Sequence, residues 1–244
     1  MTATTPKERP ILFSGEMVRA ILDGRKTQTR RVVKPQPIYD GYTPEHRNAD
    51  WYYPGVIDRN GEMQPADEQA YGVWTWDGEM AWKSPYGAPG DRLWVRETWA
   101  HVPVTAYRAS TGVHQTADPT DPDMAAVYRA GWDRSKPGRW RPSIHMPRWA
   151  SRILLEVVSV RVERLQEISN DDAKAEGIER VGGNFSVCPW RNYRIGEPGE
   201  MSMHCSAPSR SFMTLWESIN AKRGYGWESN PWVWVVEFKQ IKSE

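Results

Sequence analysis

The stretch RILLEVVSVRVERL, residues 152–165, decides the fold class. It is too continuously apolar for an exposed edge, so it predicts a strand in the interior of a sheet. Two further strands are predicted by GDRLWVRETWA, residues 90–100, and by WVWVVEFK, residues 232–239. Short helical patterns are dispersed among these strands without a regular alternation of strand and helix. This order predicts an α+β fold with a small mixed β-barrel rather than a doubly wound parallel sheet.

A short helix is predicted near the N-terminus, directly before a basic stretch. In ILFSGEMVRAILDG, residues 11–24, Ser14 is a suitable N-cap and Gly24 a suitable stop. The octet GRKTQTRR, Gly24 to Arg31, follows at once and contains four cations and two threonines but no acid. Such an octet is either a solvated turn or a site that holds an anion or performs chemistry.

A second short helix is predicted in ISNDDAKAEGI, residues 168–178. Ser169 caps its start, and Asp172 completes a capping box. Glu176 then lies in the last turn, where a carboxylate opposes the helix dipole. This unfavourable placement indicates a role for Glu176 beyond the helix itself. A third helix is predicted at residues 209–224.

The overall charge gives no reason to expect nucleic acid or a membrane as a partner. The 244 residues include 32 Lys and Arg against 31 Asp and Glu, a formal net charge of +1. No apolar run is long enough to span a membrane, and the N-terminal MTATTPKERP lacks the apolar core of a signal peptide. We therefore expect a cytoplasmic protein without membrane contact.

Metal and cofactor sites are not indicated by the sequence. Its two cysteines suit a reducing compartment better than a disulfide scaffold. His204 beside Cys205, with the distant His145, does not complete the short ligand spacing of a structural zinc site. We expect no metal and no other cofactor, and the sequence makes no prediction of the oligomeric state.

The chain is long enough to bury a substantial core, and we expect one domain over residues 1–244. Long insertions, rich in Pro and Gly, are expected at about residues 35–90, 101–128 and 179–208. At the end of the second one, AAVYRA, residues 125–130, is compatible with a strand. The first insertion is expected to contain some short hairpins, because a structureless loop of that length is unusual in a compact domain.

One local region is strongly basic. Residues 129–152 contain seven cations against one acid, Asp133, with three tryptophans interleaved. Cations mixed with stacking aromatic rings suit single-stranded nucleic acid, although an ordinary solvated loop can have the same composition. The side chains predicted to contact RNA or single-stranded nucleic acid are Arg139, Trp140, Arg141, Arg148 and Trp149.

Several stretches taken together resemble an ASCH domain, in particular the longer versions encoded by phages and prophages. The resembling stretches are ILDGRKTQTRR (21–31), GDRLWVRETW (90–99), SIHMPRWASRI (143–153), VVSVRVERLQEISNDDAKAEGI (157–178) and WVVEF (234–238). The resemblance implies a PUA-like fold, a small mixed β-barrel with flanking helices and, here, long loop insertions. It also implies RNA or a modified nucleoside as the partner, because that fold is associated with both.

Some small bacterial proteins of this family are amidohydrolases that remove the acetyl group from N4-acetylcytidine. Their G-x-K-x-x-T-x-R pattern is matched here by Lys26 and Thr29, with Arg31 or its neighbour Arg30 at the last place. The position of their catalytic glutamate is matched by Glu176. The resemblance therefore implies a hydrolase of an acylated nucleoside or nucleobase, with Lys26, Thr29 and Glu176 as catalytic residues.

These three residue types can hydrolyse an amide together. Thr29 could attack the acyl carbon and Lys26 remove its proton, provided that burial or neighbouring cations lower the pKa of Lys26. Glu176 could protonate the leaving amine or orient Lys26. In a regular strand Lys26 and Thr29 would point to opposite faces. The trio therefore requires a turn-like segment around Lys26 and a strand that starts near Thr29.

Four more side chains are predicted to bind the substrate. Arg30 or Arg31 could hold an oxyanion or a phosphate, and Arg25 adds positive charge. Glu97 lies on the apolar side of its predicted strand, so it either lines the same pocket or pairs with a cation in the barrel wall.

Other interpretations of the same residues stay open. A non-catalytic module would hold phosphate on the octet and stack bases on the tryptophans. A ribonuclease could use Lys26 and Glu176 as general base and acid. In a purely structural alternative, Lys26 and Thr29 are surface residues and Glu176 pairs with Lys174 or Arg180.

Overall fold

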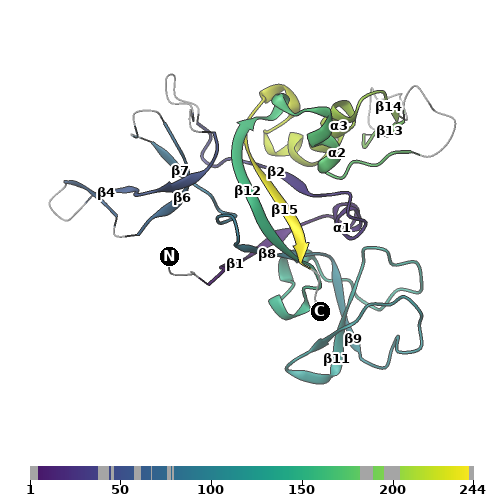
Figure 1. Cartoon of the computed structure of the whole chain (residues 1–244). Helices are drawn as coiled ribbons and strands as arrows, with labels where there is room; N and C mark the ends of the chain where they lie inside the picture. The colour runs from purple at the N-terminus through teal and green to yellow at the C-terminus, as the bar shows by residue number, and fades with distance from the viewer. Residues whose placement is uncertain are drawn as a thin grey trace. The chain divides into compact units, whose positions relative to one another are not determined.

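The computed structural model describes residues 5–37, 44, 47–57, 62–66, 68–75, 78, 80–181, 189–194 and 204–241. Within these residues the fold is α+β, rich in strands and with few helices, as predicted (Figure 1). The strand pairings of the described residues close no barrel.

The chain divides into two compact units, each assembled from separate stretches of sequence. Unit 1 comprises Met1–Gly24, Gly90–Glu156 and Lys239–Glu244, and unit 2 comprises Arg25–Pro89 and Val157–Phe238. The single domain expected over residues 1–244 stays a prediction.

The first sheet of unit 1 is built around β8 (Arg92–Arg96), one of the predicted strands. It pairs in parallel with β1 (Glu8–Leu12) and in antiparallel with the start of β12 (Leu154–Arg164), where Leu155 lies opposite Leu93. The predicted N-terminal helix is confirmed as α1 (Gly15–Leu22). Its cap Ser14 accepts a hydrogen bond from the Met17 amide, as the sequence predicts for an N-cap.

A second sheet of unit 1 has the strand order β10-β11-β9. Its strands are β9 (Trp99–Pro103), β10 (Thr116–Asp118) and β11 (Asp121–Tyr128). Half of residues 101–128, expected as a loop insertion, therefore lie in strands. The cause is the run Ala125–Tyr128, which is buried and pairs along its length with β9. Two 3₁₀ turns follow, at Ser143–His145 and Arg148–Ala150.

In unit 2, the strands β12, β15 and β2 are neighbours in that order within a five-stranded sheet. The last strand of the chain, β15 (Trp232–Ile241), pairs in antiparallel with β2 (Gln28–Val32), so that Thr29 lies opposite Val236. The apolar residues of β12 are mostly buried, apart from Val158, which is 48% exposed. The prediction that this strand lies in the interior of a sheet is confirmed.

Two helices belong to unit 2, and both were predicted. They are α2 (Asn170–Ala175) and α3 (Pro208–Asn220), which pack against each other. The capping box of α2 forms as expected: the Ser169 hydroxyl accepts from the Asp172 amide at 3.0 Å. Gly177 follows with a φ of 82°, a conformation that favours glycine and ends the helix.

The remaining strands of unit 2 form small sheets in two of the expected insertions. They are β3 (Asp50–Tyr52), β4 (Gly55–Ile57), β5 (Met63–Pro65), β6 (Ala70–Trp74), β7 (Ala81–Lys83), β13 (Trp190–Arg191) and β14 (His204–Cys205). The first insertion thus contains the short hairpins that were expected. Cys188 lies outside the described residues, while Cys205 is buried.

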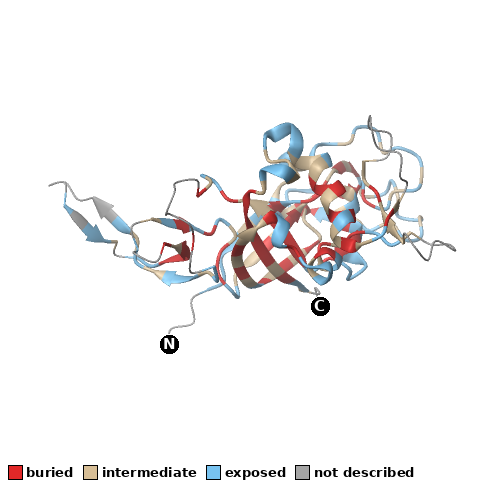
Figure 2. Ribbon diagram, turned by 90° about the horizontal axis from the view of Figure 1, so that it is seen from above, coloured by how far each residue is buried: buried red, intermediate tan, exposed pale blue. Residues whose placement is uncertain are grey.

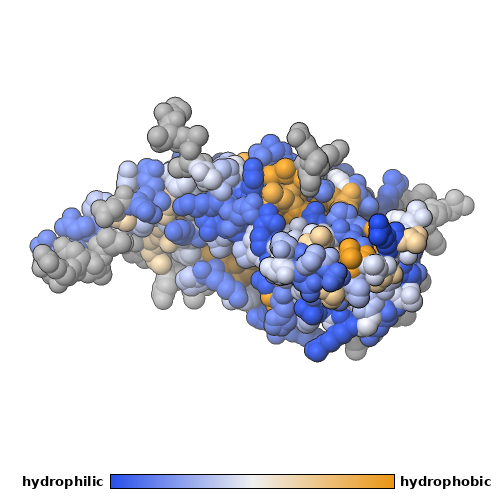
Figure 3. Space-filling model, turned by 90° about the horizontal axis from the view of Figure 1, so that it is seen from below, coloured by the Kyte–Doolittle hydropathy of each residue, from blue (hydrophilic) through white to orange (hydrophobic). Residues whose placement is uncertain are grey.

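Burial follows the strands, and the surrounding turns are mostly exposed (Figure 2). The face presented in Figure 3 is mainly hydrophilic. Among the described residues, no helix is both long and apolar enough to cross a membrane. The same residues bring together no group of three or more His, Cys, Asp or Glu side chains that could hold a metal ion.

Candidate functional site

The backbone of unit 2 brings the basic octet against the end of α2. Lys26 and Glu176 form an isolated antiparallel β-bridge, and the Thr27 amide donates to the Ala175 carbonyl at 2.9 Å. Glu176 is the C-cap residue of α2. Two residues that are 150 positions apart in the sequence therefore meet through main-chain contacts as well as through their side chains.

The Lys26 ammonium group lies in a closed polar environment. Its side chain is 0% exposed, and Nζ donates to Glu176 Oε2 at 2.7 Å, to the Glu176 carbonyl at 2.8 Å and to the Gln28 carbonyl at 2.8 Å. Burial lowers the pKa of Lys26, and the charges of Arg31 and Arg30 act in the same direction. Glu176 opposes this shift but does not cancel it. Lys26 therefore loses its proton more readily than a surface lysine.

Arg30 shares the Glu176 carboxylate with Lys26. Its guanidinium is also 0% exposed and lies 3.4 Å from Glu176 Oε1, with Asp172 Oδ2 at 3.5 Å and a close contact to Glu163. The ring centroid of Phe212 is 5.8 Å from the guanidinium carbon. One oxygen of Glu176 thus faces a lysine and the other an arginine.

This group extends into a larger network of charges. Arg161 lies 3.5 Å from Glu163 and 3.3 Å from Asp172, and it also contacts Glu237. Burial alone would raise the pKa of Asp172, but the hydrogen bond from Ser169 and the charge of Arg30 hold that pKa below its ordinary value. Asp172 therefore both caps α2 and neutralises part of the cationic cluster.

Thr29 lies on the other side of β2 from this network. Side chains alternate along a strand, so Thr29 points away from the face on which its neighbour Arg30 contacts Glu176. The backbone is already extended at Lys26, where it bridges to Glu176, and it stays extended through β2. The turn-like segment required for Lys26 and Thr29 to meet is not formed. The structure therefore joins Lys26, Glu176 and Arg30, and it directs the buried Thr29 to the opposite face.

The other two arginines of the octet have different surroundings. Arg25 is exposed and donates to the Gly177 carbonyl at 3.0 Å. Arg31 alternates with Arg30 and so shares the face of Thr29. Burial lowers the pKa of Arg31, and the charges of Tyr86 and Glu176 act in the opposite direction.

Glu97 belongs to unit 1, and the structure shows it in an ion pair. It is 1% exposed, and its two oxygens accept from Arg152 Nε at 2.8 Å and Arg152 Nη2 at 3.0 Å. Burial raises the pKa of Glu97, although the hydrogen bond and charge of Arg152 oppose the shift. Of the two roles open to Glu97 from the sequence, pairing with a cation is the one observed.

The predicted nucleic-acid contacts also lie in unit 1. Arg139, Arg141 and Arg148 are exposed. Arg148 is partly neutralised by Glu8, with Nε to Oε2 at 2.7 Å, and Arg141 lies 5.0 Å from the centre of the Trp99 ring. The cations thus present their charge at the surface.

The two predicted tryptophans are half-buried and make edge-to-face contacts within the unit. Trp149 packs against Trp99 at 5.9 Å, and Trp140 packs against Trp132 at 5.4 Å between ring centroids. Part of each ring is therefore committed to packing, which leaves less of it for stacking on bases.

Sequence reasoning missed the residues that complete these pairs. Arg152 was counted only as one cation of the basic region, and Arg161 and Glu163 only as parts of a strand. The sequence did contain a signal for Arg161 and Glu163. They are opposite charges two residues apart in an otherwise apolar strand, so they lie on one face of the strand and need charged partners there.

No protein-family model, curated protein or solved structure matches the chain. The resemblance to ASCH domains therefore stays a prediction, and the geometry of the residues is the basis for proposing a function.

Proposed function

We propose that the protein is a hydrolase of an acylated nucleoside or nucleobase, with an amide of the N4-acylcytidine type as substrate. The observation that supports this best is the buried pair of Lys26 and Glu176, in which burial lowers the pKa of the lysine. A desolvated lysine against a carboxylate is an arrangement typical of proton-transfer sites. The purely structural alternative placed Lys26 at the surface, whereas it is 2% exposed.

The proposal includes the fold implied by the resemblance, a PUA-like ASCH domain with a small mixed β-barrel, flanking helices and insertions. Three features agree with it. The octet follows a short helix, the segment of α2 follows the longest strand, and the last strand of the chain pairs beside the octet. RNA or a modified nucleoside is the partner proposed on the same basis.

The proposed chemistry assigns one role to each member of the pair. An oxygen nucleophile attacks the acyl carbon and gives its proton to neutral Lys26 Nζ, while Arg30 stabilises the oxyanion. The C–N bond then breaks, and the leaving amine takes a proton from Lys26 through Glu176. Thr29 is the nucleophile implied by the resemblance; it needs a change in β2 to reach Lys26, and a water molecule must then hydrolyse the acyl-threonine ester to release the acid. A water molecule as the first nucleophile needs no change in β2, but the contacts around the 0% exposed Lys26 side chain must open to admit it.

The test measures cytidine and acetate released from N4-acetylcytidine by the full chain. We expect Glu176→Gln to lower turnover by about 100-fold or more, because general acid–base catalysis typically contributes that much. The matched control is Glu237→Gln, which removes an acid of the same network that touches Arg161. This control should keep turnover within about threefold of the wild type. Circular dichroism checks that both variants fold.

Two results would overturn the proposal: no release by the wild type, or an equal loss in both variants. The nucleophile is assigned by a separate pair of variants. Thr29→Val should abolish turnover, and Thr29→Ser should retain much of it, if the hydroxyl attacks. If water attacks, Thr29→Val retains turnover.

A second candidate function is binding of RNA or single-stranded nucleic acid without turnover. The observation that favours it is the set of exposed arginines in unit 1, Arg139, Arg141 and Arg148, next to half-buried tryptophans. Labelled RNA that binds with strong salt dependence, while N4-acetylcytidine stays intact, would favour this function over the hydrolase.

A further inference from the structure

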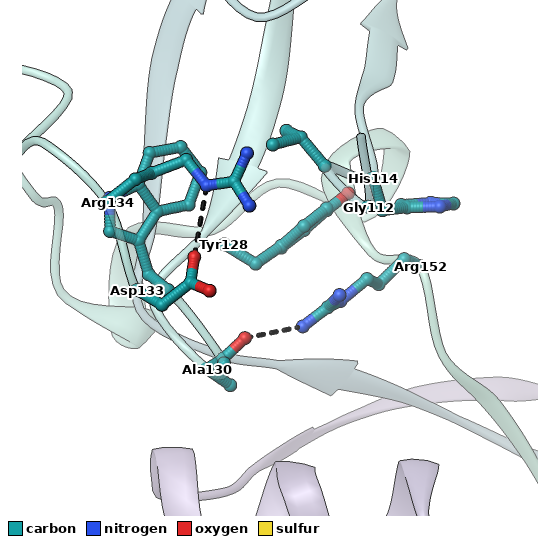
Figure 4. Close-up of a pocket in the computed structure, with 10 residues that line it drawn as sticks. Gly112, His114, Tyr128, Ala130, Asp133, Arg134 and Arg152 are labelled. Atoms are coloured by element: carbon teal, nitrogen blue, oxygen red, sulfur yellow. Dashed lines mark hydrogen bonds and ion pairs between the residues drawn. The ribbon is translucent and has the colours of Figure 1, made fainter. Parts of the chain in front are cut away.

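Unit 1 contains a small pocket far along the sequence from the octet. It lies at the end of β11, between the loop around His114, the loop around Trp132 and the side chain of Arg152 (Figure 4). Its volume is about 40 Å³. A single water needs about 10–15 Å³ on a comparable measure, so the pocket admits a small polar group and not a whole nucleoside.

One wall of the pocket is the guanidinium of Arg152, which is held rigidly. Glu97 accepts from its Nε and Nη2, the Ala130 carbonyl lies 3.5 Å from Nη2, and the ring centre of Tyr128 is 4.1 Å from the guanidinium carbon. Among the described residues, Nη1 has no hydrogen-bond partner. Arg152 is thus pre-positioned, with one nitrogen left to bind a ligand.

A second guanidinium enters from the opposite side. Figure 4 shows Arg134 and Arg152 extending toward the same space, with Tyr128 and His114 along its edge. Arg134 Nε lies 3.1 Å from Asp133, its Nη2 lies 3.4 Å from the Thr111 carbonyl, and its guanidinium carbon lies 5.9 Å from the Trp132 ring centre. Its Nη1 likewise makes no hydrogen bond within the described part of the chain.

The charge around the pocket favours an anion, because the cations of residues 129–152 outnumber the nearby acids Asp133 and Glu97. Glu97 pairs with Arg152 from outside the pocket lining, whereas Asp133, which pairs with Arg134, itself lines the pocket. In each guanidinium Nη1 is the nitrogen left for a ligand. The surrounding residues 129–152 add further cations, among them Arg129, Lys136 and Arg139. A tetrahedral phosphate matches paired guanidinium groups in shape and charge, and it fits the small volume.

We propose that this pocket binds the phosphate group of a nucleotide or of an oligonucleotide end, held between Arg134 and Arg152. The site lies wholly in unit 1, whereas Lys26 and Glu176 lie in unit 2. It does not depend on the hydrolase proposal, because phosphate binding is measured without turnover.

The test uses the full chain and one short single-stranded oligonucleotide, labelled at its 3′ end, in a 5′-phosphorylated and a 5′-hydroxyl form. Fluorescence anisotropy gives the Kd of each. We expect the phosphorylated form to bind about tenfold more tightly, since a hydrogen bond between charged groups contributes on that scale. Inorganic phosphate should compete with it.

Two variants with the same change in charge distinguish binding in the pocket from general electrostatic attraction between the oligonucleotide and the protein. Arg134→Gln should remove the tenfold difference between the two oligonucleotides. Arg108→Gln neutralises an exposed arginine outside the pocket and should leave the difference intact. Arg152→Gln alone would leave Glu97 buried without its cation. The double variant Arg152→Gln and Glu97→Gln removes both charges and should also remove the difference.

Competition by a nucleoside 5′-monophosphate would show that a free nucleotide is a ligand. If the monophosphate does not compete while the phosphorylated oligonucleotide binds, the pocket prefers the end of a strand. Both results support a phosphate site. Equal Kd values for the two oligonucleotides with the wild type would overturn it, as would equal effects of Arg134→Gln and Arg108→Gln.

Discussion

Glu176 in unit 2 lies against a lysine, whereas Glu97 in unit 1 lies against an arginine. Both acids are almost fully buried, at 3% and 1% exposed. Lys26 reaches Glu176 through a single ammonium nitrogen, and its pKa is lowered by burial. Arg152 donates to both oxygens of Glu97 through two guanidinium nitrogens, Nε and Nη2.

The difference separates two uses of a buried pair. In unit 2 the cation itself can release a proton, so the pair suits acid–base chemistry. In unit 1 the cation is a guanidinium, a group that binds carboxylates through paired hydrogen bonds, so the pair fixes the direction of Arg152, and the group whose pKa is shifted is Glu97. The following predictions test that contrast, from the largest expected effect to the smallest.

Removing the acid of the arginine pair should cost the most stability. In Glu97→Ala, Arg152 stays buried without its carboxylate, and breaking a buried pair in this way typically costs about 3–5 kcal/mol. Urea unfolding followed by tryptophan fluorescence measures the loss. Glu237→Ala is the control, because its 40% exposed side chain should contribute about 1 kcal/mol or less. A loss for Glu97→Ala no larger than that of the control would contradict the role given to this pair.

Exchanging the cations should affect the two pairs differently. Lys26→Arg keeps the positive charge but removes the group that can lose a proton, so turnover of N4-acetylcytidine should fall by about 100-fold. Arg152→Lys, the reverse exchange in unit 1, should leave turnover unchanged. Thermal unfolding checks that both variants are folded, and Lys26→Met repeats the test with a smaller side chain. Unchanged turnover in both Lys26 variants would exclude Lys26 as the base.

The two pairs should give opposite slopes of stability against pH. The folded chain holds the Lys26 proton less tightly than the unfolded chain, so stability should rise as pH increases from the lowered pKa toward the ordinary value. Glu97 has a raised pKa, so its contribution is present below the ordinary pKa and is lost as pH rises through the raised one. Urea unfolding at a series of pH values measures both slopes. Lys26→Met should reduce the rise of stability with pH and keep the fall due to Glu97, and Glu97→Gln should do the reverse.

Binding of an anion in the unit 1 pocket should strengthen at acidic pH. Burial, with the charge of Arg152, lowers the pKa of His114, which is therefore neutral near pH 7. Protonation at lower pH adds a third cation beside Arg134 and Arg152. Sulfate is the suitable probe, because it keeps both charges over this range. We expect its affinity to increase severalfold as the pH falls from 7 through the lowered pKa of His114 in the wild type, and to stay constant over the same range in His114→Asn.

Local signals in the sequence predicted most of the elements. Ser14 and Ser169 marked helix starts correctly, and the apolar run of residues 154–162 gave an interior strand. The loop expected before Ala125 was wrong where β10 and the first half of β11 form, whereas AAVYRA, residues 125–130, was compatible with a strand from the sequence. The first half of β11 is polar, and its pairing partners lie elsewhere in the chain.

The contacts between distant residues were harder to predict. Spacing alone gave no reason for Lys26 to meet Glu176, and the resemblance to a family supplied that expectation. Because side chains alternate along a strand, the sequence did indicate that Lys26 and Thr29 can meet only if the segment between them turns. The extended backbone of β2 shows that this turn is not formed. The partner of Glu97 lies 55 residues away, and such pairs depend on strand register and loop path, which no local pattern encodes.

The aromatic cluster next to the unit 1 pocket has an optical consequence. The ring centroids of Trp132 lie 4.9 Å from those of Tyr107 and 5.4 Å from those of Trp140, both nearly perpendicular. Rings at this separation couple their electronic transitions and give a near-ultraviolet circular dichroism band that vanishes when their mutual orientation is lost. Because Trp132 also borders the pocket, a ligand that reorients this ring should change the band, which is recorded without an attached dye.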